Sequence, residues 1–364
     1  MYAERLARLR RRMADLEVEV VLVSVGADLP WLSGYRAMPL ERLTMLVVPQ
    51  SGAVTLVVPR LEAPRVVRRP EVFDLAAWDE TEDPVALVAD LVGPARSLAV
   101  GDRTWAAPLL ELQARLPGAR WQPASLVTGP LRAVKDAAEV ASLRSASAAA
   151  DRVAAQLQAG EIALVGRSEA EVSADLGRRL VAEGHASVNF AIVAAGANAA
   201  SPHHDPGERV IGPGEVVLCD FGGTMADGYC SDITRCVHTG PPPPELRHLY
   251  QVLEEAQAAA VAAAVVGTPC EDVDAVARRI IAEGGYGDAF IHRTGHGIGL
   301  DEHENPYLVG GNCEALVPGH AFSVEPGIYL PGRFGARIED IVVATEAGPE
   351  ALNQVPHGLV EVDA

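Results

Sequence analysis

The stretch VVLCDFGGTMADGYCSDITR, residues 216–235, decides the fold of the second half of the chain. An apolar run ends at Asp220, glycine-rich turn residues follow, and a second apolar run begins after Asp232. This pattern predicts a β-hairpin that turns within residues 222–228 and carries one carboxylate on each strand. Two acids on adjacent strands repel each other unless a cation lies between them. The alternative is that Asp220 caps a turn and Asp232 pairs with Arg235.

A second pair of acids occupies the same kind of setting near the C-terminus. Glu325 follows the apolar segment Phe322-Ser323-Val324, and Glu339 lies within the apolar run of residues 336–342. Each segment predicts a strand, in which an unpaired carboxylate is costly to bury. The alternative is a salt bridge such as Glu339 with Arg337, but one arginine cannot neutralise every acid in this set.

His296 lies in the segment TGHGIG, residues 294–299, where alternating glycines let the backbone approach another element closely. His292 precedes it by four residues, which is the spacing of a helical two-histidine zinc site. The glycines argue against a helix, so we reject that zinc site. His296 is instead predicted to join the four acids.

Together these residues predict a metal centre. Four carboxylates and one imidazole form a hard, oxygen-rich site that suits Mn²⁺, Co²⁺ or Fe²⁺, and Zn²⁺ less distinctively. A single ion does not need so many anionic ligands. We therefore expect two divalent ions that share carboxylates, with manganese as the first choice.

Two further histidines are predicted to act on the substrate. One belongs to the adjacent pair His203 and His204, and the other is His303 in the segment DEHE. Neighbouring residues in an extended segment point in opposite directions, so only one of the pair can face the site. We choose His203 and expect His204 to occupy a solvated loop. His203 and His303 would hold the substrate carbonyl and stabilise a tetrahedral intermediate.

Composition restricts the class of protein. A chain of 364 residues favours two domains, and a formal net charge of −19 disfavours nucleic-acid and membrane partners. Five cysteines without a CxxC pair indicate reduced thiols rather than a disulfide framework. No apolar stretch reaches the ~20 residues of a membrane span. These features predict a cytoplasmic protein.

The pattern of elements changes near residue 128. Strand-like and helical segments alternate up to that point, and Thr128-Gly129-Pro130 is expected to break the chain there. Residues 1–128 are predicted to form an α/β domain. Residues 129–364 are predicted to be α+β, with helices on one face of a largely antiparallel sheet. The helices expected in this second domain cover residues 136–159, 168–183, 245–266 and 271–283.

Taken in order, the motifs resemble metallopeptidase family M24, the creatinase/prolidase/aminopeptidase P superfamily, and within it the Xaa-Pro peptidase branch. The resemblance rests on Asp220, Asp232-Ile-Thr-Arg235, Gly295-His296-Gly297-Ile298-Gly299, His303, Glu325-Pro-Gly-Ile-Tyr329 and Arg337-Ile-Glu339-Asp340. It implies a pita-bread catalytic domain behind a smaller creatinase-type N-terminal domain, and a homodimer. The implied ligands of the two metal ions are Asp220, Asp232, His296, Glu325 and Glu339. The residues implied in substrate binding or proton transfer are His203, His303 and Arg337.

The resemblance also implies a small peptide substrate with proline at its second position. A dipeptidase must fix a free carboxylate next to the scissile bond, which calls for a cation. No Lys or Arg lies between His303 and Glu325, and Tyr307 stands where some dipeptidases of the family carry an arginine. We therefore expect an Xaa-Pro aminopeptidase, with Arg333 or an N-domain arginine as the cation if the protein is instead a dipeptidase (prolidase).

Other activities on this fold remain alternatives. Metal-free creatinase-like enzymes and non-catalytic relatives predict gaps among the five ligand positions, and all five are filled. A metal-dependent hydrolase or lyase of another small molecule stays open.

In the expected mechanism Glu325 relays a proton to the departing proline nitrogen and His303 stabilises the intermediate. The hairpin is one residue longer than the commonest family spacing, so a bulge is expected within residues 225–228.

Overall fold

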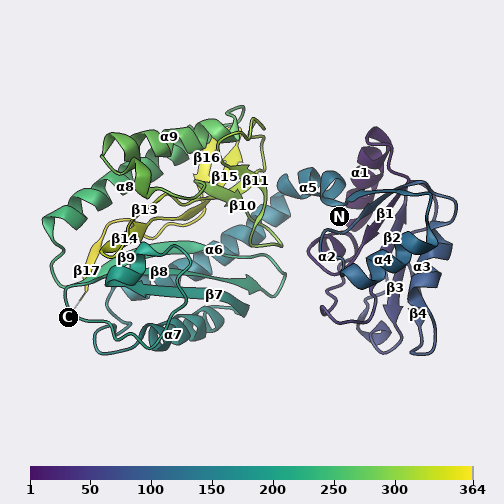
Figure 1. The fold of residues 1–364 in the computed structure, drawn as a ribbon, viewed down its shortest axis with the longest axis horizontal. Helices are drawn as coiled ribbons and strands as arrows, with labels where there is room; N and C mark the ends of the chain where they lie inside the picture. The colour runs from purple at the N-terminus through teal and green to yellow at the C-terminus, as the bar shows by residue number, and fades with distance from the viewer. Residues whose placement is uncertain (363–364) are drawn as a thin grey trace. The chain divides into compact units, whose positions relative to one another are not determined.

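The computed structural model describes residues 1–362 and divides into two units, residues 1–132 and residues 133–364. Figure 1 shows the ribbon coloured from the N-terminus to the C-terminus. Each unit buries its own apolar clusters, as the length of the chain predicted. In the described part of the chain, no helix is both long enough and apolar enough to span a membrane.

The N-terminal unit is built on one mixed sheet whose strands are short and apolar. Its six strands follow the order β4-β3-β2-β1-β5-β6, in which β1 pairs antiparallel with β2 and parallel with β5. The strands are β1 (Val20–Val23), β2 (Met45–Pro49), β3 (Thr55–Pro59), β4 (Asp74–Trp78), β5 (Ser97–Val100) and β6 (Arg120–Pro123). The helices are α1 (Tyr2–Asp15), α2 (Asp28–Ser33), the 3-10 helix η1 (Ala63–Arg65), α3 (Pro84–Val92), α4 (Ala106–Arg115) and α5 (Ser125–Ala133). The alternation of strands and helices in this unit confirms the predicted α/β pattern.

The prediction that residues 128–130 interrupt the secondary structure is wrong, because helix α5 runs through them with Pro130 in its interior. A proline inside a helix leaves the carbonyl four residues earlier without its usual partner. That carbonyl belongs to Leu126, and the Arg12 guanidinium donates to it through Nε at 3.1 Å and Nη2 at 3.0 Å. A distant side chain therefore compensates for the proline, which local sequence rules cannot anticipate.

The C-terminal unit contains two helix pairs with sheets between them. Its helices are α6 (Ala137–Gln158), α7 (Glu169–Ala182), α8 (Pro244–Ala263) and α9 (Cys270–Glu283), with the short 3-10 helices η2 (Gly196–Ala200) and η3 (Gly287–Ala289). These α-helices match the four expected ranges within a few residues. Asp136 and Ser168 close capping boxes with Glu139 and Glu171 at the starts of α6 and α7.

The strands of this unit form two larger sheets and one hairpin. The first sheet has the order β17-β9-β8-β7, the second β11-β10-β12-β15-β16, and β13 pairs with β14. The strands are β7 (His185–Ala195), β8 (Val216–Met225), β9 (Ile233–Thr239), β10 (Gly295–Gly297), β11 (Glu304–Leu308), β12 (Ala321–Val324), β13 (Gly327–Leu330), β14 (Phe334–Arg337), β15 (Asp340–Thr345), β16 (Gly348–Ala351) and β17 (Val360–Val362). All these pairings are antiparallel except that of β17 with β9.

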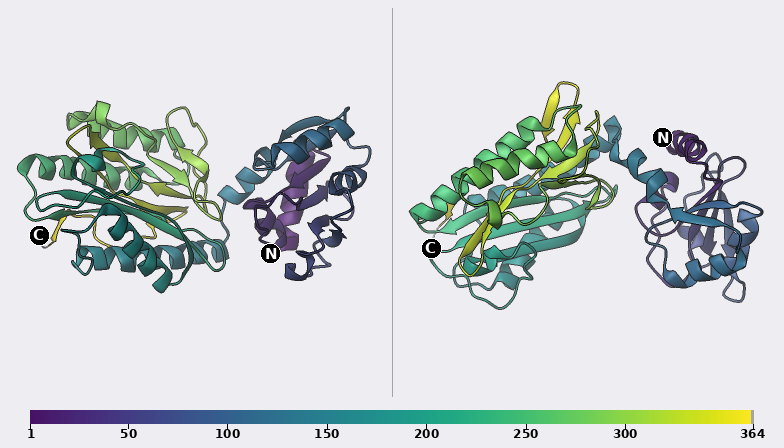
Figure 2. Two further views of the ribbon diagram at one scale, coloured as in Figure 1. Left: turned by 60° about the horizontal axis from the view of Figure 1, so that its bottom comes forward. Right: turned by 45° about the horizontal axis from the view of Figure 1, so that its top comes forward.

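Helices cover the outer side of each sheet rather than one face of a single sheet. Apolar residues of α6 and α7 pack against β7, β8 and β9, whereas those of α8 and α9 pack against strands of the second sheet. Figures 1 and 2 show the two helix pairs on opposite sides of the C-terminal unit. The α+β class is confirmed, and the predicted single helical layer is replaced by two.

The hairpin of β8 and β9 keeps one register along its whole length. Asp220 pairs with Thr234, Phe221 pairs with Ile233, and the bridge between Thr224 and Cys230 continues the same register. The expected bulge in the turn is therefore absent, and the irregularities of this sheet fall in β7. Since side chains alternate between faces, this register places the carboxylates of Asp220 and Asp232 on the same face.

His320 gives the C-terminal unit a pH-dependent stability. It is 2% exposed, and burial, reinforced by the charge of Lys135, lowers its pKa to about 4. The unfolded chain takes up a proton at this histidine near pH 6.5, so stability is lost as the pH falls from about 6.5 towards 4. We expect the metal-free protein to lose roughly 2 kcal/mol more than the His320→Asn variant between pH 7 and pH 5. Urea unfolding of both proteins at the two pH values measures this difference, and parallel losses would contradict the assignment.

Candidate active site

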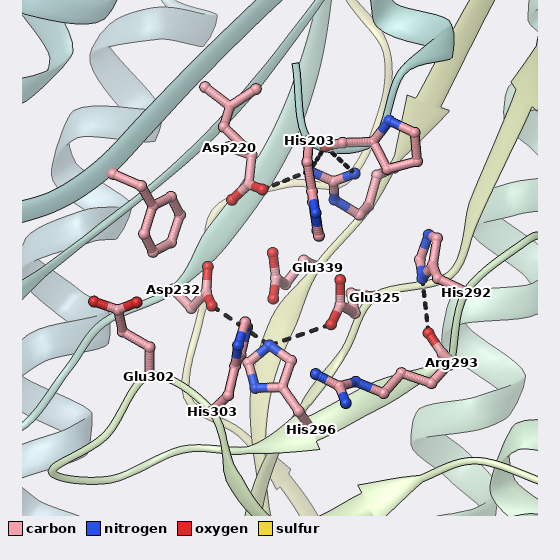
Figure 3. Close-up of a pocket in the computed structure, with 14 residues that line it drawn as sticks. His203, Asp220, Asp232, His292, Arg293, His296, Glu302, His303, Glu325 and Glu339 are labelled. Atoms are coloured by element: carbon pink, nitrogen blue, oxygen red, sulfur yellow. Dashed lines mark hydrogen bonds and ion pairs between the residues drawn. The ribbon is translucent and has the colours of Figure 1, made fainter. Parts of the chain in front are cut away.

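A cavity of about 510 Å³ opens within the C-terminal unit, and its size is ordinary for a small-molecule site. Figure 3 shows the side chains around it. The lining residues are Phe190, Ile192, Pro202, His203, Asp220, Asp232, His292, Arg293, His296, Glu302, His303, Glu325, Arg337 and Glu339. All five predicted metal ligands are among them, although they are up to 119 positions apart in the sequence, from Asp220 to Glu339.

Strands and the short segments that join them bring the five residues together. Asp220 lies on β8, Asp232 directly before β9, His296 on β10, Glu325 between β12 and β13, and Glu339 between β14 and β15. The Nε2 atom of His296 lies 3.2 Å from Oε1 of Glu325 and 3.7 Å from Oδ2 of Asp232. Asp232, His296 and Glu339 each offer a ligand atom within 4.8 Å of the others.

The electrostatics of this cluster are unfavourable without a cation. Burial, followed by the charge of Glu339, raises the pKa of Asp232 well above its usual value, and burial and Glu325 do the same to the pKa of Glu339. Burial raises the pKa of Glu325 to about 7. Burial also lowers the pKa of His296 to about 3, which leaves a neutral imidazole able to bind a metal. A cation between the carboxylates would reverse the shifts of the acids.

Two buried oxygen atoms point to the same conclusion. Oδ1 of Asp220 and Oδ1 of Asp232 are buried, and neither has a hydrogen-bond partner among residues 1–362. A buried carboxylate oxygen is rarely left without a partner, because its lost hydration must be replaced. Oxygen atoms of this kind, with one imidazole, form the donor set of a divalent transition-metal site. The residues present therefore fit a divalent cation.

Neighbouring side chains fix the orientation of the acids. The Thr234 hydroxyl donates to Oε2 of Glu339 at 2.7 Å, and the Ser323 hydroxyl donates to Oε1 of Glu325 at 3.1 Å. The backbone N–H of His296 donates to the same Ser323 oxygen at 3.0 Å. These contacts restrict the ligand side chains to one arrangement.

The salt bridges considered from the sequence do not form. Arg235 is fully buried and pairs with Asp340 at 2.7 Å rather than with Asp232. Arg337 pairs with Asp220 rather than with Glu339, and its Nη1 also donates to the Tyr329 hydroxyl at 2.7 Å. Arg337 lines the cavity as expected, although its guanidinium is engaged by protein groups.

The histidines predicted to act on the substrate both line the cavity. The His303 ring meets the His296 ring edge-on with centroids 4.0 Å apart, and His203 points into the cavity in Figure 3. Burial and the charge of Arg293 lower the pKa of His303. The expectation that His204 is a solvated loop residue is wrong, because its Nε2 lies 2.7 Å from Oε2 of Glu169 and its side chain is 19% exposed.

Two residues that line the cavity, His292 and Arg293, were not assigned to it from the sequence. His292 was weighed only as a zinc ligand; its Nε2 instead hydrogen-bonds the Tyr329 hydroxyl at 2.9 Å, and β10 confirms that no helix joins it to His296. Arg293 lines the cavity with its guanidinium 4.5 Å from the centre of the Tyr307 ring. Three basic residues, His292, Arg293 and His296, within five positions were the available signal.

Comparisons with known proteins agree with this geometry. Residues 141–346 match the model of metallopeptidase family M24, and residues 5–134 match the creatinase/prolidase N-terminal domain. The chain belongs to metallopeptidase family M24. It is therefore a hydrolase that acts on peptides, and family membership together with the acid and histidine cluster indicates divalent metal ions.

Three relatives illustrate the similarity of this M24 peptidase to proteins of known name. The probable dipeptidase PepE of Mycobacterium tuberculosis is 44% identical over 367 residues, covering 100% of this chain and 97% of the relative. The Xaa-Pro dipeptidase of Lactobacillus helveticus is 36% identical and covers 94% of this chain and 95% of the relative. The crystal structure of a prolidase from Thermococcus sibiricus matches with a TM-score of 0.93 at 35% identity, covering 100% of this chain and 99% of that one. The pita-bread architecture of the M24 unit is thereby confirmed.

Proposed function

We propose that this M24 peptidase is an Xaa-Pro dipeptidase, a prolidase, that hydrolyses the bond before proline in dipeptides. The observation that carries the proposal is the position of the Arg293 guanidinium at the cavity. Among residues 1–362 no carboxylate forms an ion pair with its guanidinium, which lies over the Tyr307 ring and borders the cavity. Figure 3 shows the side chain extending towards His296 and Glu325. A free arginine beside an acidic metal cluster suits the free carboxylate of a dipeptide.

This proposal reverses the preference for an aminopeptidase that the sequence suggested. Tyr307 stands where some dipeptidases of the family carry an arginine. Strands β10 and β11 pair His296 with Tyr307, so a residue just before β10 reaches the side chain of residue 307. Arg293 can thus supply the cation from the neighbouring strand. Arg333, the alternative cation, is half-exposed, pairs with Glu245 and does not line the cavity.

The proposed metal ligands are Asp220, Asp232, His296, Glu325 and Glu339, holding two divalent ions with manganese as the first choice. When bound, such ions polarise the scissile carbonyl and activate a water molecule. Glu325, whose pKa is raised by burial, is placed to accept a proton and pass it to the proline nitrogen. His303 and His203 would hold the carbonyl oxygen as charge develops on it, and Arg337 would fix Asp220.

Further features stay proposals about the whole protein. We propose a cytoplasmic location, which is supported by five free cysteines. We also propose a homodimer and a creatinase-type domain of residues 1–128 before a catalytic domain of residues 129–364. The acidic net charge of −19 supports small peptides rather than nucleic acids or membranes as partners.

A paired hydrolysis assay tests the function. The enzyme is stripped with a chelator, reloaded with Mn²⁺ and given an Xaa-Pro dipeptide beside the matching Xaa-Pro-Xaa tripeptide. We expect cleavage only after reloading, with a higher kcat/KM for the dipeptide. A preference for the tripeptide would establish the aminopeptidase instead. Failure to cleave either peptide with metal bound would direct the search to another small-molecule substrate.

A further inference from the structure

A buried carboxylate outside the metal cluster organises the segment that carries His203. Glu169 is the first residue of α7 and is 0% exposed. Its Oε1 accepts from the backbone N–H of Ala195 at 2.8 Å and from Nδ2 of Asn198 at 3.0 Å. Its Oε2 lies 2.7 Å from Nε2 of His204. All three partners belong to residues 195–204, which lead from β7 to the cavity.

The continuation of this segment is also attached to the start of α7. The backbone N–H of Glu169 donates to the carbonyl of Arg209 at 3.0 Å, and that of Ala170 donates to the carbonyl of Gly207 at 3.0 Å. On the cavity side, Nη1 of Arg337 donates to the carbonyl of Pro202 at 3.4 Å. The backbone is therefore held on both sides of His203.

The side chains of His203 and His204 point in different directions. His204 faces Glu169, whereas His203 lines the cavity. His203 lies in a turn and His204 follows it directly, so a bond that fixes His204 also restricts the backbone that carries the His203 ring. Buried polar contacts of this kind hold a functional side chain in one geometry.

The helix itself does not need the Glu169 carboxylate. Ser168 and Glu171 already close a capping box at the start of α7. Val172, Leu176 and Leu180 bury its apolar face. Among residues 1–362, the hydrogen-bond partners of the Glu169 carboxylate are Ala195, Asn198 and His204, all in the segment that carries His203.

We propose that Glu169 and His204 are positioning residues that hold His203 in its orientation towards the substrate. This inference rests on the proposed dipeptidase function. It predicts that the two residues affect turnover through His203, although neither contacts the cavity.

A double-mutant cycle tests the inference. His203→Ala, His204→Ala and the double variant are compared with the wild type as Mn²⁺-loaded enzymes on one Xaa-Pro dipeptide. We expect His204→Ala to lower kcat about tenfold in the wild type and less than about twofold in the His203→Ala background, because a misplaced group loses most of its effect. An equal fall in both backgrounds would overturn the positioning role.

Conservative variants separate positioning from folding. Glu169→Gln keeps an oxygen for Ala195 and Asn198, and its amide can donate to His204 once that ring adopts its other tautomer. We expect Glu169→Gln to retain kcat within about threefold and Glu169→Ala to fall about tenfold. The matched control is Glu183→Gln at the other end of α7, where Glu183 pairs with Arg152 at the surface, and it should behave as the wild type.

Amide hydrogen exchange supplies a readout that does not depend on a substrate. Glu169→Ala should lose protection across residues 195–209, whereas Glu169→Gln should keep it. Unchanged protection in Glu169→Ala would overturn the inference even with an active enzyme. A wild type that cleaves no dipeptide would overturn the proposed function, and the exchange data would then still decide whether Glu169 orders the segment.

Discussion

Replacing Glu339 with glutamine is expected to abolish high-affinity uptake of divalent metal and, at the same time, to make the metal-free protein more stable. Glu339 is 2% exposed, and burial and the charges of Glu325 and Asp220 raise its pKa. A carboxylate whose pKa is raised in the folded state lowers stability at neutral pH, so its removal relieves repulsion within the cluster. We expect a gain of roughly 1–3 kcal/mol in the free energy of unfolding without metal.

When metal is present, Glu339→Gln is expected to be less stable than the wild type. Glu339 is a proposed ligand, and the loss of a ligand should weaken Mn²⁺ binding by more than about 100-fold and lower activity at least as much. Titration calorimetry with Mn²⁺ and thermal unfolding with and without the ion measure both effects. The matched control is Glu302→Gln, which removes an acid that lines the same cavity outside the five proposed ligands. Normal Mn²⁺ binding by Glu339→Gln would remove Glu339 from the ligand set.

Replacing Arg293 with methionine is expected to bring the kcat/KM values for an Xaa-Pro dipeptide and an Xaa-Pro-Xaa tripeptide close together. Methionine keeps an apolar chain against Tyr307 and removes the charge that would hold the dipeptide carboxylate. A hydrogen bond to a charged group contributes about 1.5–3 kcal/mol, so kcat/KM for an Xaa-Pro dipeptide should fall about 10- to 100-fold. The fall for an Xaa-Pro-Xaa tripeptide should be much smaller, because its carboxylate lies one residue further on.

The control for this prediction is Arg333→Met. Arg333 was one of the cations suggested by the sequence, beside an N-domain arginine, and the structure places it at the surface beside Glu245. It should leave the ratio of the two kcat/KM values unchanged. Equal losses on both substrates in Arg293→Met would show a general effect on the cavity and would leave the dipeptidase without its carboxylate anchor.

Many of the residues that line the site could be predicted from the sequence, because each lies in a short, recognisable sequence pattern. A carboxylate within an apolar segment, as at Asp220, is anomalous wherever the segment lies, since burial of an unpaired charge is costly. The same reasoning found Asp232, Glu325 and Glu339, and the glycines around His296 excluded a helix. The strands, most helices and the α+β class followed from periodicity and caps in the same way.

What the sequence could not determine depends on which distant residues meet. Periodicity does not reveal that Arg12 bonds the Leu126 carbonyl that Pro130 leaves without a partner in α5. It also does not reveal that Arg337 pairs with Asp220 and not with Glu339, which is nearer in the sequence. It also could not place Arg293 against Tyr307, because that contact follows from the register of β10 and β11. By itself the sequence predicted the two-unit organisation and the acids and histidine that the structure brings to one cavity. Only the tertiary structure decided which charged residues pair with each other, as Arg337 does with Asp220, and that Arg293 lies against Tyr307 at the cavity.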